Sequence, residues 1–190
     1  MARWDPGAED RLRKAALELY AQHGYDAVTI NQIAEHAGLT RRSYFRYFPD
    51  KREVLFAGSE RLPAAVAEAV HAVDPAVAPW PTALAAIADI GQRLVEIAQD
   101  SAVRRAVIAA SVELQERERT KLAVVTVALQ QALEARGSDP HRAQLVAQLA
   151  AAVFQTTFTV WGDADGRQTF RACLDEVVAS LRSEVFEFDD

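Results

Sequence analysis

Apolar side chains recur every three or four residues along almost the whole chain, and this spacing constrains the fold more than any other feature. Near the N-terminus, for example, Leu12, Ala15, Ala16, Leu19 and Tyr20 fall on one face of a helix. No segment shows the alternation of apolar and polar residues that is typical of a half-buried strand. The sequence therefore predicts an all-α fold of about nine helices.

Capping residues, glycines and prolines divide the chain into these helices. Thr29 with Gln32, and Asp50 with Glu53, have the spacing of capping boxes, and Pro63 predicts a kink or break. Asp5 followed by Pro6 is a plausible start for the first helix. Helices are expected over residues 5–23, 29–37, 40–48, from 50 to Pro63, and around 82–99, 102–111, 113–136, 140–161 and 168–184.

The second and third expected helices, joined at Gly38, have the dimensions of a helix-turn-helix motif. On the third helix Tyr44 and Phe48 lie four residues apart and are expected to face inward. Arg41, Arg42, Phe45 and Arg46 then fall on the outer side, where a guanidinium group can pair with guanine in the major groove. The alternative interpretation is a small helical subdomain with a solvated basic face.

The charge distribution favours the nucleic-acid interpretation, although the net charge of −6 alone opposes it. Residues 1–61 hold ten Lys or Arg and nine Asp or Glu, whereas the remainder holds eleven and eighteen. Within residues 39–52 only Asp50 is acidic, against Arg41, Arg42, Arg46, Lys51 and Arg52. Positive charge is therefore focused on one short segment, and the acidic remainder is expected to keep other faces away from phosphate.

The run from Thr29 to Leu55 resembles the TetR family of regulators, and the resemblance is gapless from about residue 12 to 56. It implies a DNA-binding domain over residues 1–55 and a helical effector-binding and dimerisation domain over 56–190. Family likeness implies that phosphates are contacted by Thr29 and Lys51. It implies that bases and backbone are approached by Thr40, Arg41, Arg42 and Ser43. It also implies packing against the DNA strand by Phe45, Arg46 and Tyr47. The family commonly has Tyr at the position of Phe45, so a phenolic hydrogen bond of about 1 kcal/mol is missing.

The same resemblance implies dimerisation through the last two long helices and an effector pocket in the larger domain. Both helices carry apolar stripes that permit half of an intermolecular four-helix bundle, although burial within one monomer is the alternative. The dimerisation candidates are Leu145, Leu149, Val153, Val160, Leu174, Val178 and Leu181. The pocket candidates, large or polar residues on apolar helices, are Trp80, Arg104, Arg105, Thr126, Gln130, Phe154, Thr157, Phe158 and Trp161.

We therefore expect a ligand-responsive transcriptional regulator, a repressor that binds a palindromic operator in double-stranded DNA as a homodimer and is released by a small molecule. No cofactor, metal or enzymatic activity is expected, because the four histidines are scattered, Cys173 is alone and no catalytic motif is present. No apolar segment predicts a signal peptide or a membrane span, so the protein is expected in the cytoplasm. A helical small-molecule-binding or scaffold protein without specific DNA binding, and a small helical enzyme, remain alternatives.

Overall fold

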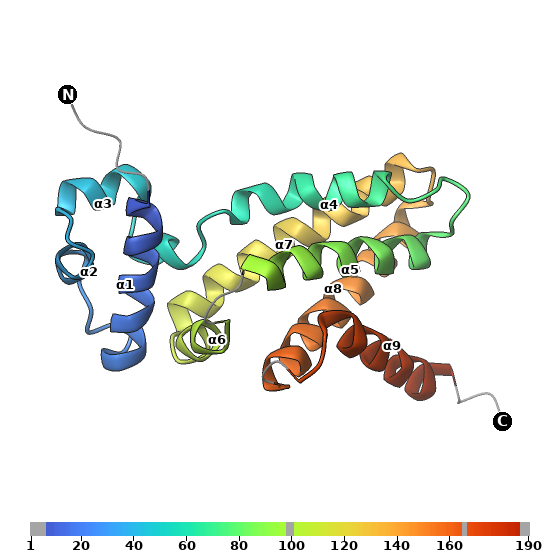
Figure 1. Cartoon of the computed structure of the whole chain (residues 1–190). Helices are drawn as coiled ribbons and strands as arrows, with labels where there is room; N and C mark the ends of the chain where they lie inside the picture. The colour runs from blue at the N-terminus through green and yellow to red at the C-terminus, as the bar shows by residue number, and fades with distance from the viewer. Residues whose placement is uncertain (1–6, 98–100, 165–166, 187–190) are drawn as a thin grey trace. The chain divides into compact units, whose positions relative to one another are not determined.

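The computed structural model describes residues 7–97, 101–164 and 167–186 of the 190-residue chain. Within these ranges the structure is helical without strands, which confirms the predicted fold class. The helices in chain order are α1 (Ala8–His23), α2 (Ile30–His36), α3 (Arg41–Tyr47), the 3-10 helices η1 (Glu53–Leu55) and η2 (Ser59–Arg61), α4 (Leu62–His71), α5 (Pro79–Ile97), α6 (Ser101–Ala109), α7 (Val112–Ala135), α8 (Pro140–Asp163) and α9 (Phe170–Phe186) (Figure 1).

These helices gather into two compact units. The N-terminal unit comprises the described parts of residues 1–60 and 100–120, so it holds α1 to α3, α6 and the first turns of α7. The C-terminal unit comprises the described parts of residues 61–99 and 121–190. The sequence suggested one boundary, between residues 55 and 56. The return of residues 100–120 to the first unit depends on contacts between distant parts of the chain, which helical periodicity does not report.

The N-terminal unit is built around α1, which packs against both α2 and α6. The apolar stripe predicted for α1 is buried: Leu12, Ala16 and Tyr20 are at most 2% exposed. Ile33 from α2 and Tyr44 from α3 complete this core, each with 0% exposure. Two helices of only seven residues cannot be stable alone, so the packing of α2 on α1 and of α3 on α2 is what fixes their geometry.

The ends of α2 and α3 are set by the predicted caps. The Thr29 hydroxyl accepts a hydrogen bond from the Gln32 amide, and the Gln32 side chain accepts one from the Thr29 amide, which completes the capping box. At α3, the Thr40 hydroxyl accepts from the Ser43 amide over 3.1 Å. The start predicted at Asp5 and Pro6 lies outside the described residues; α1 begins at Ala8, after Gly7.

The predicted fourth helix, from residue 50 to Pro63, is wrong. Asp50 does accept hydrogen bonds from the amides of Arg52 and Glu53, but only the 3-10 turn η1 follows. The Glu53 carboxylate pairs with Arg117 instead of reaching back to close a capping box. Gly58 then takes a left-handed backbone conformation with φ of +84°, and Pro63 lies in the first turn of α4, where proline is favoured, rather than breaking a helix.

In the C-terminal unit, α5 packs against α4, α8 and α9, and α8 packs against α9. Helices α5 and α9 approach closely at Gly91 of α5, which lies beside the buried ring of Phe170 at the start of α9. A Cβ atom at position 91 would lie 2.0 Å from Phe170 Cε1. Only glycine therefore fits this position while Phe170 keeps its place.

Among the described residues, α8 is the one helix long and apolar enough to cross a membrane by length and composition alone. Its inner face belongs to the core of the C-terminal unit, where Ala143, Ala147 and Ala150 are 0% exposed. A core helix in a helical bundle can have the same composition, and the buried inner face of α8 fits such a helix, while its outer face is exposed.

Candidate nucleic-acid interface

The inner face of α3 is held firmly in the N-terminal unit. Tyr44 and Phe48, predicted to face inward, are 0% and 2% exposed, which confirms that prediction. The Tyr44 hydroxyl donates to the carbonyl oxygen of Asp50 over 3.0 Å. Burial raises the pKa of the Tyr44 phenol, so the hydroxyl remains a neutral donor in this position. The helix is thus anchored by one side.

The outer flank of α3 is open to solvent. Arg41, Arg42 and Arg46 are exposed, and Phe45 is 44% exposed between them. The partners of these arginines are neutral: Arg41 donates to the Asn31 side chain, and Arg46 donates to the Tyr47 hydroxyl. Because no carboxylate of the described residues neutralises them, their positive charge is available to an approaching polyanion.

The hydroxyl groups expected at this surface serve mainly as helix caps. Thr40 and Ser43 contact one another through their hydroxyl oxygens, 3.0 Å apart, beside the first turn of α3. Thr29 is engaged with Gln32 in the capping box of α2. The three residues are exposed or half-buried at the two helix N-termini, where free backbone amides and the helix dipole favour a phosphate group.

Lys51 is directed into the protein. Its Nζ donates to the carbonyl oxygens of Tyr25, over 2.7 Å, and Val28, over 3.1 Å. The same ammonium lies 3.9 Å from the centroid of the Tyr25 ring. Two of its three N–H groups therefore hold the loop between α1 and α2, and one remains for a phosphate, the partner expected from the sequence.

This geometry predicts that Lys51→Met lowers the free energy of unfolding by about 1.5–3 kcal/mol, because a charged donor to two carbonyls is lost. Urea denaturation followed by circular dichroism measures this effect. Lys14→Met is the matched control, since the Lys14 side chain is 75% exposed and its Nζ lies as far as 4.0 Å from the Glu18 carboxylate, which makes a weak ion pair. The outcome that would contradict this prediction is a Lys51 variant with unchanged stability that releases about one counterion fewer when it binds DNA. Lys51 would then contact phosphate alone.

Residues of α7 form hydrogen bonds and ion pairs with the segments on either side of the helix-turn-helix, and the sequence did not predict these contacts. The Tyr25 hydroxyl donates to Glu113 over 2.9 Å, and Arg117 forms a bidentate ion pair with Glu53. The hydrogen bond to Glu53 raises the pKa of Arg117. Phe56 lies between two guanidinium groups, 4.9 Å from that of Arg117 and 5.2 Å from that of Arg104. The segments that flank α2 and α3 are therefore held by residues more than fifty positions further along the chain.

The pocket candidates do not form one group. Four aromatic rings of the C-terminal unit do cluster, since Phe158 lies 5.0 Å from Phe154 and from Phe170, and 5.8 Å from Trp161. The adjacent Thr157 is buried, and its hydroxyl donates to the carbonyl of Val153. Arg104 lies in the N-terminal unit with Arg105, and donates to the carbonyl of Leu55. The remaining candidates are half-buried side chains on α5 and α7: Trp80, Thr126 and Gln130.

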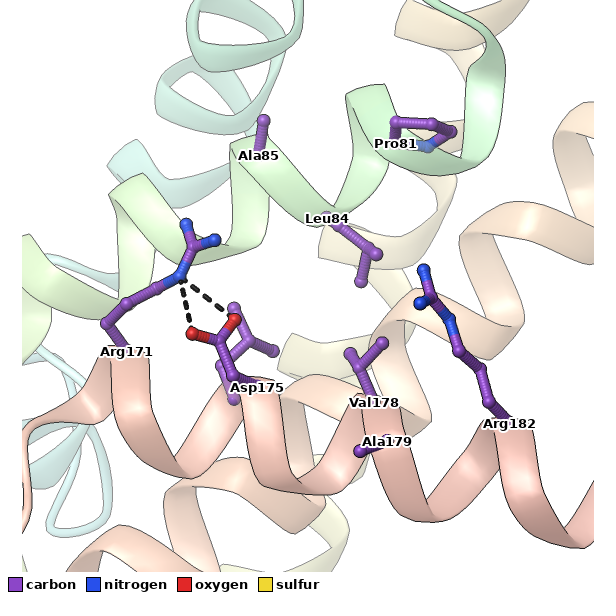
Figure 2. Close-up of a pocket in the computed structure, with 9 residues that line it drawn as sticks. Pro81, Leu84, Ala85, Arg171, Asp175, Val178, Ala179 and Arg182 are labelled. Atoms are coloured by element: carbon purple, nitrogen blue, oxygen red, sulfur yellow. Dashed lines mark hydrogen bonds and ion pairs between the residues drawn. The ribbon is translucent and has the colours of Figure 1, made fainter.

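The C-terminal unit also carries a groove of about 410 Å³ between α5 and α9 (Figure 2). Leu84 and Pro81 line it from α5, and Val178 lines it from α9. Figure 2 shows Arg171 paired with Asp175 towards one end and Arg182 at the other. None of the pocket candidates lines this groove. The groove is apolar in its middle and has charged side chains at both ends.

The dimerisation candidates divide by burial. Val153 and Leu174 are 4% and 2% exposed inside the C-terminal unit itself, so they can add almost no buried area to a dimer. Leu145 and Leu149, by contrast, are 58% and 40% exposed on the outer face of α8. Three further candidates are half-buried: Val160, Val178 and Leu181. Helical spacing identifies both faces of α8 as apolar but cannot tell which one faces the monomer core.

Comparison with known proteins is consistent with this geometry. Residues 12–57 match the family described as "Bacterial regulatory proteins, tetR family". The HTH-type transcriptional regulator TcmR of Streptomyces glaucescens is 44% identical over 45 residues, which is 24% of this chain and 20% of TcmR. The matched segment thus spans about a fifth of that relative's length.

Solved structures resemble the chain over most of its length. The fatty acid degradation regulator FadR from Bacillus halodurans is 19% identical with a TM-score of 0.56, covering 92% of this chain and 94% of FadR. NalD of Pseudomonas aeruginosa, the secondary repressor of the MexAB-OprM multidrug efflux pump, is 18% identical with a TM-score of 0.60, covering 91% of this chain and 93% of NalD. At these identities the likeness concerns the fold alone.

Proposed function

We propose that this chain, whose residues 12–57 match the tetR family of bacterial regulatory proteins, is a ligand-responsive transcriptional regulator that binds double-stranded DNA as a homodimer. One observation carries this proposal: the anchored helix α3 presents on its outer flank three arginines that pair with no carboxylate of the described residues. A helix held in this way fits the major groove, where arginine pairs with guanine and neighbouring cations pair with phosphate. The protein is proposed to act in the cytoplasm.

The experiment that tests this function is a selection of bound duplexes from a random DNA pool by the purified full-length protein. We expect a site with two related halves, about one helical turn or slightly more apart, because each copy of a dimer supplies one reading helix. Protection of the selected site from nuclease digestion locates the protein on it. Recovery of no preferred sequence at physiological salt would contradict the proposal.

We propose the direction of regulation by analogy with a protein of similar fold. NalD is described as a repressor, and we propose that this protein likewise represses transcription and leaves its operator when a small molecule binds the C-terminal unit. The aromatic cluster of Phe154, Phe158, Trp161 and Phe170 supports an apolar or aromatic effector. Candidate compounds that leave operator affinity unchanged at saturation are not effectors.

The proposed dimer uses the outer face of α8. Residues 143–162 contain no charged side chain, although Leu145 and Leu149 and their neighbour Ala152 face solvent. A depletion of charge around exposed leucines is characteristic of the centre of an interface. In a twofold dimer both copies contribute the same two leucines, so four leucine side chains are buried in the interface.

Leu145→Glu combined with Leu149→Glu is therefore expected to yield folded monomers. Burying the exposed half of each leucine contributes about 1 kcal/mol per copy, and the new carboxylates would be buried without partners. Light scattering coupled to gel filtration measures the mass, and circular dichroism verifies the helices. Val124→Glu is the control, since Val124 is 53% exposed on α7 and should leave the dimer intact. A double variant that remains dimeric at micromolar concentration would place the interface elsewhere.

A further inference from the structure

The three arginines of α3 are held in different ways. Arg41 donates from Nη1 to the Asn31 side-chain oxygen over 3.2 Å. Arg46 donates to the Tyr47 hydroxyl over 2.9 Å, with its guanidinium 4.9 Å from the centre of that ring. Arg42 makes no such contact with any described residue. The three arginines therefore carry the same charge but differ in how firmly the orientation of the guanidinium group is fixed.

The guanidinium of Arg41 is contacted from two sides. Asn31 lies in the first turn of α2 and supplies an amide oxygen, while Phe45, one turn along α3, supplies an aromatic ring 5.3 Å from Arg41 Cζ. All three residues are exposed, so the arrangement stands on the surface rather than in the core. Cation–π contact and a hydrogen bond together reduce the conformational freedom that a long side chain otherwise loses on binding.

We propose that Asn31 and Phe45 are positioning residues that orient Arg41 for one base pair, whereas the unrestrained Arg42 contacts the phosphate backbone. This inference rests on the proposed function. A guanidinium has five N–H groups, and the bond to Asn31 uses one. Enough donors remain to pair with O6 and N7 of a guanine, a contact whose value depends on direction. A phosphate accepts donors from many directions and needs no such preparation.

The proposal also explains the residue at position 45. The ring of Phe45 lies against the Arg41 guanidinium and contacts the edge of Tyr44, with centroids 5.8 Å apart. A benzene ring is sufficient for this supporting role, so a phenolic hydroxyl is not required. Asn31 was not among the candidates from the sequence, because a polar residue on a solvent-facing turn carries no signal of its own.

The test is base preference measured on duplexes changed at one base pair at a time, starting from a sequence that the parent protein selects. Arg41→Ala identifies the base pair that Arg41 reads. Asn31→Ala should weaken the preference at that same base pair by about 3- to 10-fold, the usual effect of one lost hydrogen bond. Preferences at other positions and the salt dependence of binding should stay as in the parent. Phe45→Leu should act at the same base pair.

Two variants separate positioning from a general effect. Asn31→Asp keeps an acceptor for Arg41, so it should retain the base preference while it lowers affinity for every duplex by repelling phosphate. Gln22→Ala removes an exposed amide from α1 and should change neither quantity. Thermal unfolding should be unaltered in all of them, since Asn31 is exposed.

Three results would overturn the inference. The first is an Asn31→Ala protein with the full preference at the Arg41 base pair. The second is an Asn31→Ala protein that loses affinity equally for all duplexes, which indicates a structural role. The third is an Arg41→Ala protein with every preference intact. A parent protein that selects no sequence would refute the proposed function itself, whereas these three results leave it standing.

Discussion

Replacing Arg41 and Arg42 together by alanine should lower affinity for the selected DNA by roughly 2–6 kcal/mol, which corresponds to a loss of at least about 30-fold. Both side chains extend from the solvent-facing flank of α3, and within the part of the chain that the structure describes neither pairs with a carboxylate. Their loss removes a base contact, a phosphate contact and the release of the counterions that these two contacts displace. Fluorescence anisotropy of a labelled duplex at several salt concentrations measures both the affinity and its salt dependence.

The matched control removes two arginines from the C-terminal unit. Arg171 and Arg182 are exposed on α9, so Arg171→Ala with Arg182→Ala changes the net charge by the same amount. If the effect in α3 arises only from lost charge, the two double variants will weaken binding equally. We expect the α9 variant to bind within about threefold of the parent, since these two arginines lie outside the proposed interface and exposed charges that do not contact the DNA are screened by salt. Parent-like binding by the α3 variant would refute the assigned interface.

The helix-turn-helix could be predicted from the sequence because its signals are local. Thr29 with Gln32, and Thr40 with Ser43, satisfy amides within three residues, so these short helices begin where the sequence indicates. The inward direction of Tyr44 likewise follows from helical spacing. Arg41 and Arg42 were correctly expected on the outer side, since an anchored helix leaves its opposite flank exposed.

Contacts between distant residues were beyond reach of the sequence. The ammonium of Lys51 is drawn to two carbonyl groups more than twenty residues away, although its place in the motif suggested an outward side chain. Glu53 was expected to cap a helix but instead pairs with Arg117, sixty-four residues along the chain. In both cases a charged side chain has competing partners, and only the tertiary structure decides between them.

Helix orientation within the C-terminal unit was the other limit. The stripe on α8 identified apolar positions, but α8 is apolar on both sides, so spacing could not separate Val153 in the core from Leu149 on the surface. The role of Gly91 could not be predicted either, because the sequence shows only a residue of low helix propensity inside a helix. Its role depends on Phe170, nearly eighty residues later, whose ring occupies the space of the missing side chain.

That close approach leads to the second large prediction. Gly91→Val should destabilise the protein by roughly 2–4 kcal/mol, since overpacking of a core costs about 1–3 kcal/mol and the branched side chain adds atoms where even one does not fit. The Phe170 ring cannot move aside cheaply, because Phe154 and Phe158 lie 5.9 and 5.0 Å from it. Urea denaturation measures the loss. Gln92→Ala, at the exposed neighbouring position, should stay within about 0.5 kcal/mol of the parent.

A double-mutant cycle distinguishes steric conflict from any other cause, because it predicts a change of sign. Alanine is favoured over glycine inside a helix by about 1 kcal/mol, so Gly91→Ala would stabilise α5 if nothing opposed it. In the parent the Phe170 ring opposes it, and the substitution should destabilise. In a Phe170→Ala background the ring is gone, and Gly91→Ala should now stabilise by up to about 1 kcal/mol. Because Phe170→Ala alone costs about 3–5 kcal/mol, the measurement needs a background that still folds cooperatively, and Phe170→Leu serves if it does not. The same sign in both backgrounds would show that the ring is not what excludes a side chain at position 91.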